Sequence, residues 1–472
     1  MTSFIQYYRS LSLNKKLFWL YLVLIFLEGS MRKWFMPEAQ QLWMISREPI
    51  VIFIVLNEVS KSNIKSKMAL SYMVIAVICA IFTLTIGHGY ISVCIWGFRI
   101  WFFHFPFIFI MANMLDKRDL RWILKYLIIV FLISTPLYII QFLSSDTSFW
   151  NASIGEALDS GYGVNGAVRP MGFFSHGVGA SYFNPIVVSI ILAYIFSLKY
   201  RLIFKRNITL LLVAAVTVVL ITSVSRGFVI QTFLTVFFVS FFLFSVDTFK
   251  HIKPIFTFIV IVTIAILVIN NTSIGQNLMK PLLNRFENAS ESEGGVEGIF
   301  TNRAIYPYLW FAPPNFTTLN WSLTPFGYGL GLSSNFAAQT LSGEFNFLLG
   351  ENSSQQITGE MGILFGTIVF FLRIGFMFYI LPECIKSLKN QKDVLPLALW
   401  PLAFTTYGNG NINLTMTLGL ICLTMILLLV ALKPDPIPHN RKMQQEPPQP
   451  THKFRPFELN RLTGIRSSGD SK

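Results

Sequence analysis

The chain has 472 residues, of which 53% are hydrophobic and only 13% are charged, and its mean hydropathy is +0.57. This composition excludes an ordinary soluble protein, because a soluble chain of this length exposes more polar surface. The net charge of +14 could suggest nucleic-acid binding, but the basic residues fall between long apolar runs, so we expect no nucleic-acid partner.

Apolar runs long enough to cross a membrane recur along the chain, since a spanning helix needs about 20 apolar residues. They predict an all-α polytopic membrane protein with about twelve transmembrane helices. The predicted spans are 17–34, 42–58, 68–86, 90–113, 120–143, 176–198, 207–223, 226–246, 254–270, 357–381, 394–409 and 412–432.

The positions of the basic residues predict the orientation of these spans. With the N-terminus in the cytoplasm, most of the 37 lysines and arginines fall on the inner side. The positive-inside rule therefore predicts a multi-pass protein with both termini cytoplasmic. Residues 1–432 are expected to form the transmembrane bundle. The tail 433–472 is basic, Pro-rich and without apolar periodicity, so we expect it to be disordered.

Two outer loops interrupt the short connections between spans. One runs from about 144 to 175, and the larger runs from about 271 to 354, between the ninth and tenth predicted spans. Long loops are usually functional or disordered. The larger loop is rich in aromatic residues and Pro-Gly turns, which predicts a packed cap outside the membrane.

The sequence carries no signal for a metal or a cofactor. The four cysteines lie in or beside apolar runs without metal-like spacing, and nucleotide-binding and zinc-protease motifs are absent. We therefore expect no cofactor and no metal site.

Ionisable residues inside predicted spans are costly and are functional candidates. Arg99 and Arg226 fall toward the outer ends of their spans, and Arg373 is expected to extend its side chain toward the cytoplasm. Arg47 is followed directly by Glu48, so a structural ion pair is an open alternative for it.

The outer loops add three more arginines, Arg169, Arg285 and Arg303. Several arginines at one outer face suggest an anionic ligand, and arginine suits the binding of phosphate oxygens. The alternative is that each one pairs with a loop glutamate or a lipid headgroup. His176, at the start of a predicted span, is a further candidate, and a helix N-cap is its structural alternative.

Several different short motifs occur along the chain in a combination that is known from one family. They are Ser225-Arg226-Gly227, Arg303 to Trp310, Pro325-Phe326-Gly327-Tyr328-Gly329-Leu330-Gly331, Glu360-Met361-Gly362, the segment RPMGFF that contains Arg169, and EGSMRKWFMP near the first outer turn. With the predicted spans and large outer loop, the chain resembles the bacterial O-antigen polymerase/O-antigen ligase superfamily.

The resemblance implies a metal-independent glycosyltransferase at the outer face of the bacterial cytoplasmic membrane. Its donor and acceptor would be glycans on undecaprenyl diphosphate, with membrane lipids, a chain-length regulator and a flippase as further partners. Arg226 and Arg303 match the family's phosphate-handling arginines, and Arg169 matches a further one. We expect substrate-binding roles for six residues: Arg169, Arg285, Arg99, His176, Asn352 and Glu360.

The chain departs from the ligase pattern at one position. Ligases place a His-Asn pair nine residues before the glutamate of E-x-G, whereas this chain has Glu351 and Asn352 there. We therefore expect a polymerase of lipid-linked repeat units with Glu351 as general base; transfer to a lipid or protein acceptor and a flippase remain the alternatives. Asn352, Gln356 and Glu360 recur at every fourth position, which predicts a polar stripe that faces the bundle.

Overall fold

The computed structural model describes residues 4–152, 163–164, 167–197, 207–246, 271–301, 305, 308–309, 324–341 and 353–434. Regular structure in these ranges is helical apart from one short β-hairpin. Six helices are long and apolar enough to cross a membrane, which is the pattern of a multi-pass membrane protein. They are Lys67–Thr85, Ile91–Met114, Lys117–Leu143, Gly177–Phe196, Arg226–Ser245 and Ser353–Gln391.

The sequence predicts about twelve spans, which is more than the six long apolar helices found in the described residues. Two further apolar helices, Ile208–Thr222 and Thr415–Ala431, are shorter than the six. The predicted span 254–270 and the tail from residue 435 onward lie outside the described residues.

The N-terminal part of the chain contains α1 (Phe4–Arg9), α2 (Leu13–Ser30), the π-helix η1 (Met31–Phe35), the 3-10 helix η2 (Pro37–Ala39), α3 (Gln40–Ile45), α4 (Glu48–Ser60), α5 (Lys67–Thr85), α6 (Ile91–Arg99), the π-helix η3 (Ile100–His104), α7 (Phe105–Met114) and α8 (Lys117–Leu143).

The remaining elements are the 3-10 helix η4 (Phe149–Asn151), β1 (Gly163–Val164), β2 (Ala167–Val168), α9 (Gly177–Phe196), α10 (Asn207–Thr222), α11 (Arg226–Val246), α13 (Ser273–Glu293), α14 (Gly295–Phe300), α15 (Asn335–Thr340), α16 (Ser353–Gln391), α17 (Leu395–Asn409) and α18 (Thr415–Ala431). The two strands pair antiparallel, with Gly163 opposite Val168.

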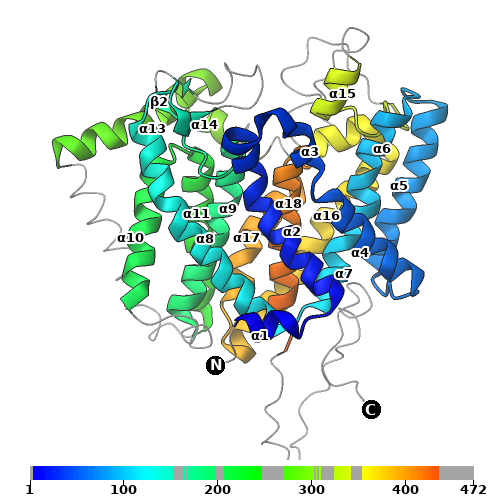
Figure 1. Cartoon of the computed structure of the whole chain (residues 1–472), viewed down its shortest axis with the longest axis horizontal. Coiled ribbons are helices and arrows are strands. Elements are labelled where there is room, and N and C mark those ends of the chain that lie inside the picture. The colour runs from blue at the N-terminus through cyan, green and yellow to red at the C-terminus, as the bar shows by residue number, and fades with distance from the viewer. Residues whose placement is uncertain are drawn as a thin grey trace, which may run out of the picture.

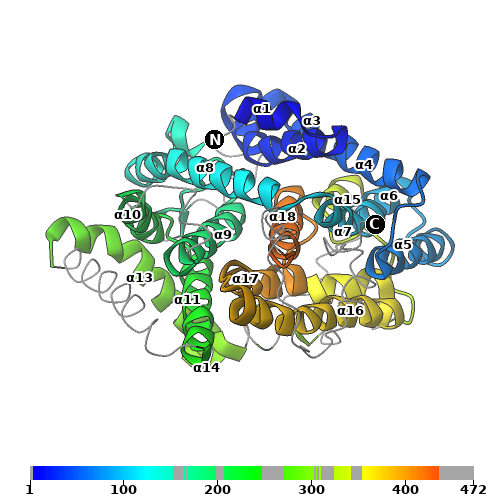
Figure 2. The ribbon, with the colours of Figure 1, turned by 90° about the horizontal axis from the view of Figure 1, so that it is seen from below.

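Helix α18 is the centre of the bundle. Every one of its residues is buried, and it packs against α7, α9 and α17. Seen along the bundle, α8 to α11 lie on one side of it and α4 to α7 with α16 lie on the other (Figure 2). Because the final helix is apolar all round, its place in the core agrees with its composition.

The bundle has two end faces, which Figure 1 separates clearly. The terminal face carries α1 and the C-terminal end of α18, where Lys117 forms an ion pair of 3.2 Å with Asp393. The loop face, at the opposite end, carries the β-hairpin, α13, α14 and α15 (Figure 1). The two described ends of the chain therefore lie at the same face.

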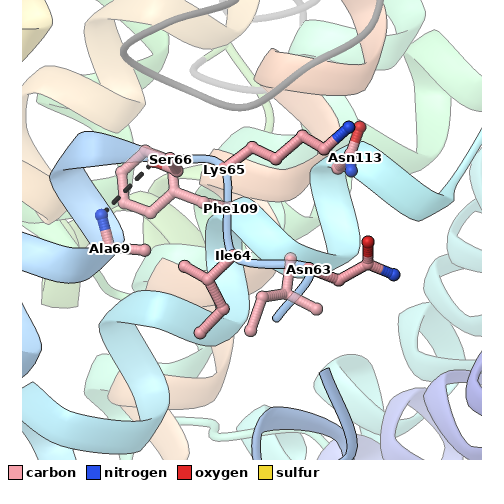
Figure 3. A pocket seen from close by; sticks show the side chains of 8 residues that line it. Asn63, Ile64, Lys65, Ser66, Ala69, Phe109 and Asn113 are labelled. Atoms are coloured by element: carbon pink, nitrogen blue, oxygen red, sulfur yellow. Dashed lines mark hydrogen bonds between the residues drawn. The ribbon is translucent and has the colours of Figure 1, made fainter. Parts of the chain in front are cut away.

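A small recess lies at the terminal face, between the α4–α5 connection and α7 (Figure 3). Ser66 Oγ accepts a hydrogen bond of 3.3 Å from the amide of Ala69 there, which caps α5. The recess has about 210 Å³ of free volume, including open solvent, and its lining residues are Asn63, Ile64, Lys65, Ser66, Ala69, Phe109, Ile110 and Asn113. It lies at the far end of the bundle from the loops that the sequence singles out.

Helix α16 is broken into two arms at Gly362, whose φ of 75° and ψ of 175° are not helical. A Cβ placed on Gly366 would lie 2.8 Å from Cα of Thr358, and Arg373 Nη1 donates a 2.9 Å hydrogen bond to Ser353 Oγ. Residues this far apart on one straight helix could not touch. The half-helix 353–361 therefore folds back antiparallel along the long arm 363–391.

This geometry corrects the predicted span 357–381. The half-helix does not run into the long arm as one continuous helix. It runs toward the loop face, turns at Gly362, and the long arm then returns through the bundle. Sequence periodicity could not reveal the turn, because it depends on contacts of both arms with residues 324–331, which are distant in the sequence.

Residues 324–331, here called the glycine loop, close the break. The amides of Tyr328 and Gly329 donate to the carbonyls of Gly359 and Glu360, at 2.9 and 3.0 Å. The amides of Ile363 and Leu364 donate to carbonyls of the loop at 3.0 and 3.2 Å. The loop thus binds the last carbonyls of the half-helix and the first amides of the long arm, which would otherwise lack partners.

We predict that Gly362→Ala disrupts this closure. A Cβ at Gly362 would lie 2.3 Å from the carbonyl oxygen of Pro325, and its backbone angles belong to a region that costs other residues about 1–3 kcal/mol. Thermal unfolding of the purified protein in detergent should therefore occur at a clearly lower temperature. Gly375→Ala on the long arm is the control, because an added Cβ there meets nothing within 4 Å. Equal losses for both variants would contradict the prediction.

Candidate functional site

Three arginines that the sequence singles out gather at the loop face. Arg169 lies in the segment before α9, Arg226 is the first residue of α11, and Arg285 lies on α13. Arg226 and Arg285 are both close enough to Arg169 to lower its pKa. We call Arg169, Arg226 and Arg285 the loop-face arginines.

The segment that carries Arg169 is fixed through its backbone. Gln141 Oε1 accepts hydrogen bonds from the amides of Met171 and Gly172, at 3.0 and 2.8 Å. Lys33 Nζ donates a 2.8 Å hydrogen bond to the carbonyl of Gly172. Both side chains are buried, so this backbone has defined partners in the interior.

Close packing adds to this fixation. A Cβ on Gly29 would lie 2.2 Å from the carbonyl oxygen of Phe173, so only glycine permits the observed contact between α2 and this segment. The contact joins two of the motifs noted in the sequence, EGSMRKWFMP and RPMGFF. The first motif therefore positions the second.

The start of α9 holds the guanidinium of Arg169. Arg169 Nη2 donates a 3.2 Å hydrogen bond to Ser181 Oγ, and its Nε is buried without a hydrogen-bond partner. Its side chain also packs on Gly177, where a Cβ would lie 2.7 Å from Nε. His176 is the N-cap of this helix, with Nδ1 accepting a 3.2 Å hydrogen bond from the amide of Val178. The capping alternative for His176 is thus what the structure shows.

The start of α11 meets the start of α9 through two serines. Ser225 Oγ lies 2.8 Å from Ser181 Oγ and accepts a 3.3 Å hydrogen bond from the amide of Phe228, which caps α11. The residue before it, Val224, has a positive φ of 46°, which is unusual for a β-branched residue. Its carbonyl accepts a 3.0 Å hydrogen bond from Arg285 Nη1, so α13 is tied to the same turn.

The electrostatics of this region favour an anion. Burial, Arg285 and Arg226 together lower the pKa of Arg169 to about 10, and burial and Arg226 lower the pKa of Arg285. No ion pair between described residues involves Arg169 or Arg285. The N-terminal ends of α9 and α11 add positive dipole ends at the same place. A phosphate group here would relieve the mutual repulsion of the arginines.

Glu360 lies elsewhere, at the closure of α16. Its Oε1 accepts a 2.9 Å hydrogen bond from the amide of Ser333, and the side chain is buried. Gln356, also buried, accepts a 2.8 Å hydrogen bond from Asn413 Nδ2. Two members of the predicted polar stripe thus face the bundle, where each binds a different segment.

Arg99 belongs to a separate buried network. It forms an ion pair with Glu48, which also lies 2.8 Å from His104 Nε2. Arg47, beside Glu48 in the sequence, forms its ion pair of 2.7 Å with Glu28 instead. The structure therefore does not bring Arg99 to the loop-face arginines, and the neighbouring charges of the sequence pair with other helices.

Arg373 is fully buried, which overturns the prediction that it extends toward the cytoplasm. Its Nε donates a 2.6 Å hydrogen bond to the carbonyl of Tyr407, and its Nη1 donates to Ser353 Oγ. The side chain turns inward because the half-helix and α17 supply acceptors inside the bundle.

Three predicted residues, Arg303, Glu351 and Asn352, lie outside the described residues. Among the residues that the structure does describe, no three histidine, cysteine, aspartate or glutamate side chains are grouped to hold a metal ion.

No protein-family model, curated protein or solved structure matches the chain. The resemblance to the O-antigen polymerase and ligase superfamily therefore rests on the short motifs. Two pairs of these motifs are in contact in the structure: EGSMRKWFMP with RPMGFF, and the glycine loop with Glu360-Met361-Gly362.

Sequence reasoning missed the residues that position the loop-face arginines. The sequence does not single out Lys33, Gln141 or Ser181 as candidates. Gln141 lies near the end of an apolar run, and a buried side-chain amide needs hydrogen-bond partners. This position could have indicated that Gln141 binds another segment of the chain. Nothing in the sequence indicates that Ser181 and Ser225 meet.

We predict that Lys33→Met loosens the segment that carries Arg169. The change removes the hydrogen bond from Lys33 Nζ to the carbonyl of Gly172 and leaves that carbonyl only the 3.3 Å hydrogen bond from Gln141 Nε2. The loss of one such hydrogen bond costs about 0.5–1.5 kcal/mol. Thermal unfolding in detergent should occur at a lower temperature than for Lys65→Met, the control at an exposed lysine on the terminal face. Identical unfolding of the two variants would show that the Lys33 hydrogen bond is not needed.

Proposed function

We propose that the protein is a membrane glycosyltransferase that joins glycan repeat units carried on undecaprenyl diphosphate. The observation that supports this most directly is the gathering of the loop-face arginines around the N-terminal ends of α9 and α11. Such a site fits the diphosphate of a lipid-linked donor, since guanidinium groups and helix N-termini both bind phosphate oxygens.

The chemistry of glycosyl transfer gives these arginines a role. Negative charge grows on the diphosphate as its bond to the anomeric carbon breaks. Cations held in fixed positions stabilise that charge in the transition state without having to reorganise. Ser181 and the carbonyl of Val224 supply such fixation for Arg169 and Arg285.

The acceptor hydroxyl must lose its proton, and we propose Glu351 as the general base. In this proposal Arg303 joins the loop-face arginines as a further phosphate-binding residue. Glu351 stands where ligases carry histidine, which favours a polymerase over an enzyme that transfers the finished glycan to a lipid or protein acceptor.

In this proposal the loop face is the outer face of a bacterial cytoplasmic membrane, and both termini are cytoplasmic. The donor and acceptor reach the site from the outer leaflet, where membrane lipids surround it. A flippase would supply them, and a chain-length regulator would act on the product.

A flippase or exporter of lipid-linked glycans is the second candidate. One observation favours it: Arg373 and the start of the half-helix form a polar centre deep inside the bundle. Transporters often bind anionic groups at half-helix ends near the middle of the membrane. The clustering of arginines at a single face supports the transferase instead.

We predict that Arg169→Ala and Arg226→Ala each lower polymer formation by about 10²–10³-fold, the loss expected when one transition-state donor is removed. Arg303→Ala should lower polymer formation to a similar extent. Single lipid-linked repeat units should accumulate in the outer leaflet, as measured by gel analysis of polymer and by labelling of the surface glycan.

The control for this experiment is Lys280→Ala, an exposed cation on the same helix as Arg285. It should leave polymer formation unchanged. Accumulation of repeat units in the inner leaflet of the arginine variants would support the flippase. Unchanged polymer in these variants would refute the proposed function.

A separate prediction concerns the base. Glu351→Gln should cripple turnover while leaving donor binding intact, because the amide keeps the size of the side chain but cannot accept the proton. Turnover and binding of the lipid-linked donor are measured on the same preparation. Full turnover by the glutamine variant would remove Glu351 as the base.

A further inference from the structure

The guanidinium of Arg373 lies in the interior of the bundle without an anion. The side chain is fully buried, and its Nη2 has no hydrogen-bond partner. No ion pair between described residues involves it. Aromatic rings surround it, with centroids 5.5 Å away for Phe105, 5.8 Å for Tyr407 and 6.0 Å for Trp101.

Arg373 lies deep inside the bundle on the long arm. It follows the turn at Gly362 by eleven residues on the long arm, which corresponds to a depth of about 16 Å at a rise of about 1.5 Å per residue. The hydrocarbon core of a bilayer is about 30 Å thick. Charged side chains at this depth are rare and usually mark a path or site for a polar ligand.

The half-helix begins at the same depth, because Ser353 Oγ accepts a hydrogen bond from Arg373. Its N-terminal end therefore points its positive dipole toward the guanidinium. Asn409 Oδ1 accepts a 2.9 Å hydrogen bond from the amide of Ser354, so one of the first amides is already bound. Two sources of positive potential thus meet in the bundle interior, and the aromatic rings supply only weak compensation.

We propose that Arg373 and the N-terminal end of the half-helix 353–361 form a second anion site, distinct from the loop-face arginines, that binds a phosphate-type oxyanion. The free Nη2 donates to the oxyanion, and the half-helix end adds its dipole. The diphosphate of a lipid-linked glycan is the source of this anion only if the proposed function holds. The site itself follows from the geometry alone.

The test measures binding of radiolabelled inorganic pyrophosphate to the full-length protein in detergent. The background is Arg169→Ala with Arg226→Ala and Arg285→Ala, which removes all three loop-face arginines. Pyrophosphate should still bind in this background, and adding Arg373→Met should abolish that binding. Adding Arg373→Lys keeps the charge but loses the planar donor group, so it should weaken binding by about tenfold. Equal binding with and without Arg373→Met overturns the proposal.

A second measurement does not depend on variants that could misfold. Crystals of the unaltered full-length protein, soaked in arsenate, should show an anomalous scattering peak in contact with the Arg373 guanidinium. Peaks confined to the loop face would overturn the second site. Because neither readout measures polymer formation, either can fail while the proposed transferase stands, and either can succeed if the transferase fails.

The source of the anion is decided by competition. In nanodiscs, undecaprenyl diphosphate should displace labelled pyrophosphate from the background that retains Arg373. Displacement supports a lipid-linked ligand at this site. Binding of pyrophosphate without displacement by the lipid overturns the link to the lipid-linked substrate and leaves a site for free phosphate.

Discussion

The fold depends on one constraint of the membrane interior, which is that every backbone amide and carbonyl needs a partner. A helix that breaks at Gly362 exposes groups at two helix ends, and the glycine loop binds them from both sides. This closure holds the half-helix against the long arm and brings Ser353 to Arg373. The positions of Glu360 and Ser333 follow from the same turn. The glycine loop is therefore a structural closure, although its pattern resembles a ligand-binding motif.

The distribution of charge divides the bundle into three parts. Glu28 with Arg47 and Glu48 with Arg99 are paired inside it, so their charges balance locally. The loop-face arginines repel one another, and no described carboxylate pairs with Arg169 or Arg285. Arg373 lies in the bundle interior and is the third part of this distribution. The acceptors of its described hydrogen bonds are the neutral oxygens of Tyr407 and Ser353. Removing one partner of either buried pair would leave a buried charge uncompensated, which is strongly destabilising. Arg169, Arg285 and Arg373, which form no ion pair with a described carboxylate, mark where we propose that an anion binds.

Much of the architecture could be predicted from the sequence. Apolar length predicted the helical, multi-pass class. The motifs directed attention to Arg169 and Arg226, and the scarcity of basic residues in the outer loops directed it to Arg285; the structure brings these three together. The partners of charged residues could not be predicted, because Arg47 and Glu48 are neighbours in the chain but pair across different helices. Hydropathy also could not locate the turn at Gly362 or the inward direction of Arg373. Both depend on contacts between segments that are distant in the sequence, such as the glycine loop and α16.

The central place of α18 bears on how the protein is made. This helix is buried along its whole length and is the last one of the described chain to leave the ribosome. The carbonyl of Thr415 at its start accepts a hydrogen bond from Arg47 Nη2, and the carbonyl of Ala431 at its end accepts one from Lys117 Nζ, so both ends bind residues inserted much earlier. Until α18 is made, the side chains of Arg47 and Lys117 therefore lack these carbonyl acceptors. Loss of α18 would remove these acceptors together with the surface against which α7, α9 and α17 pack.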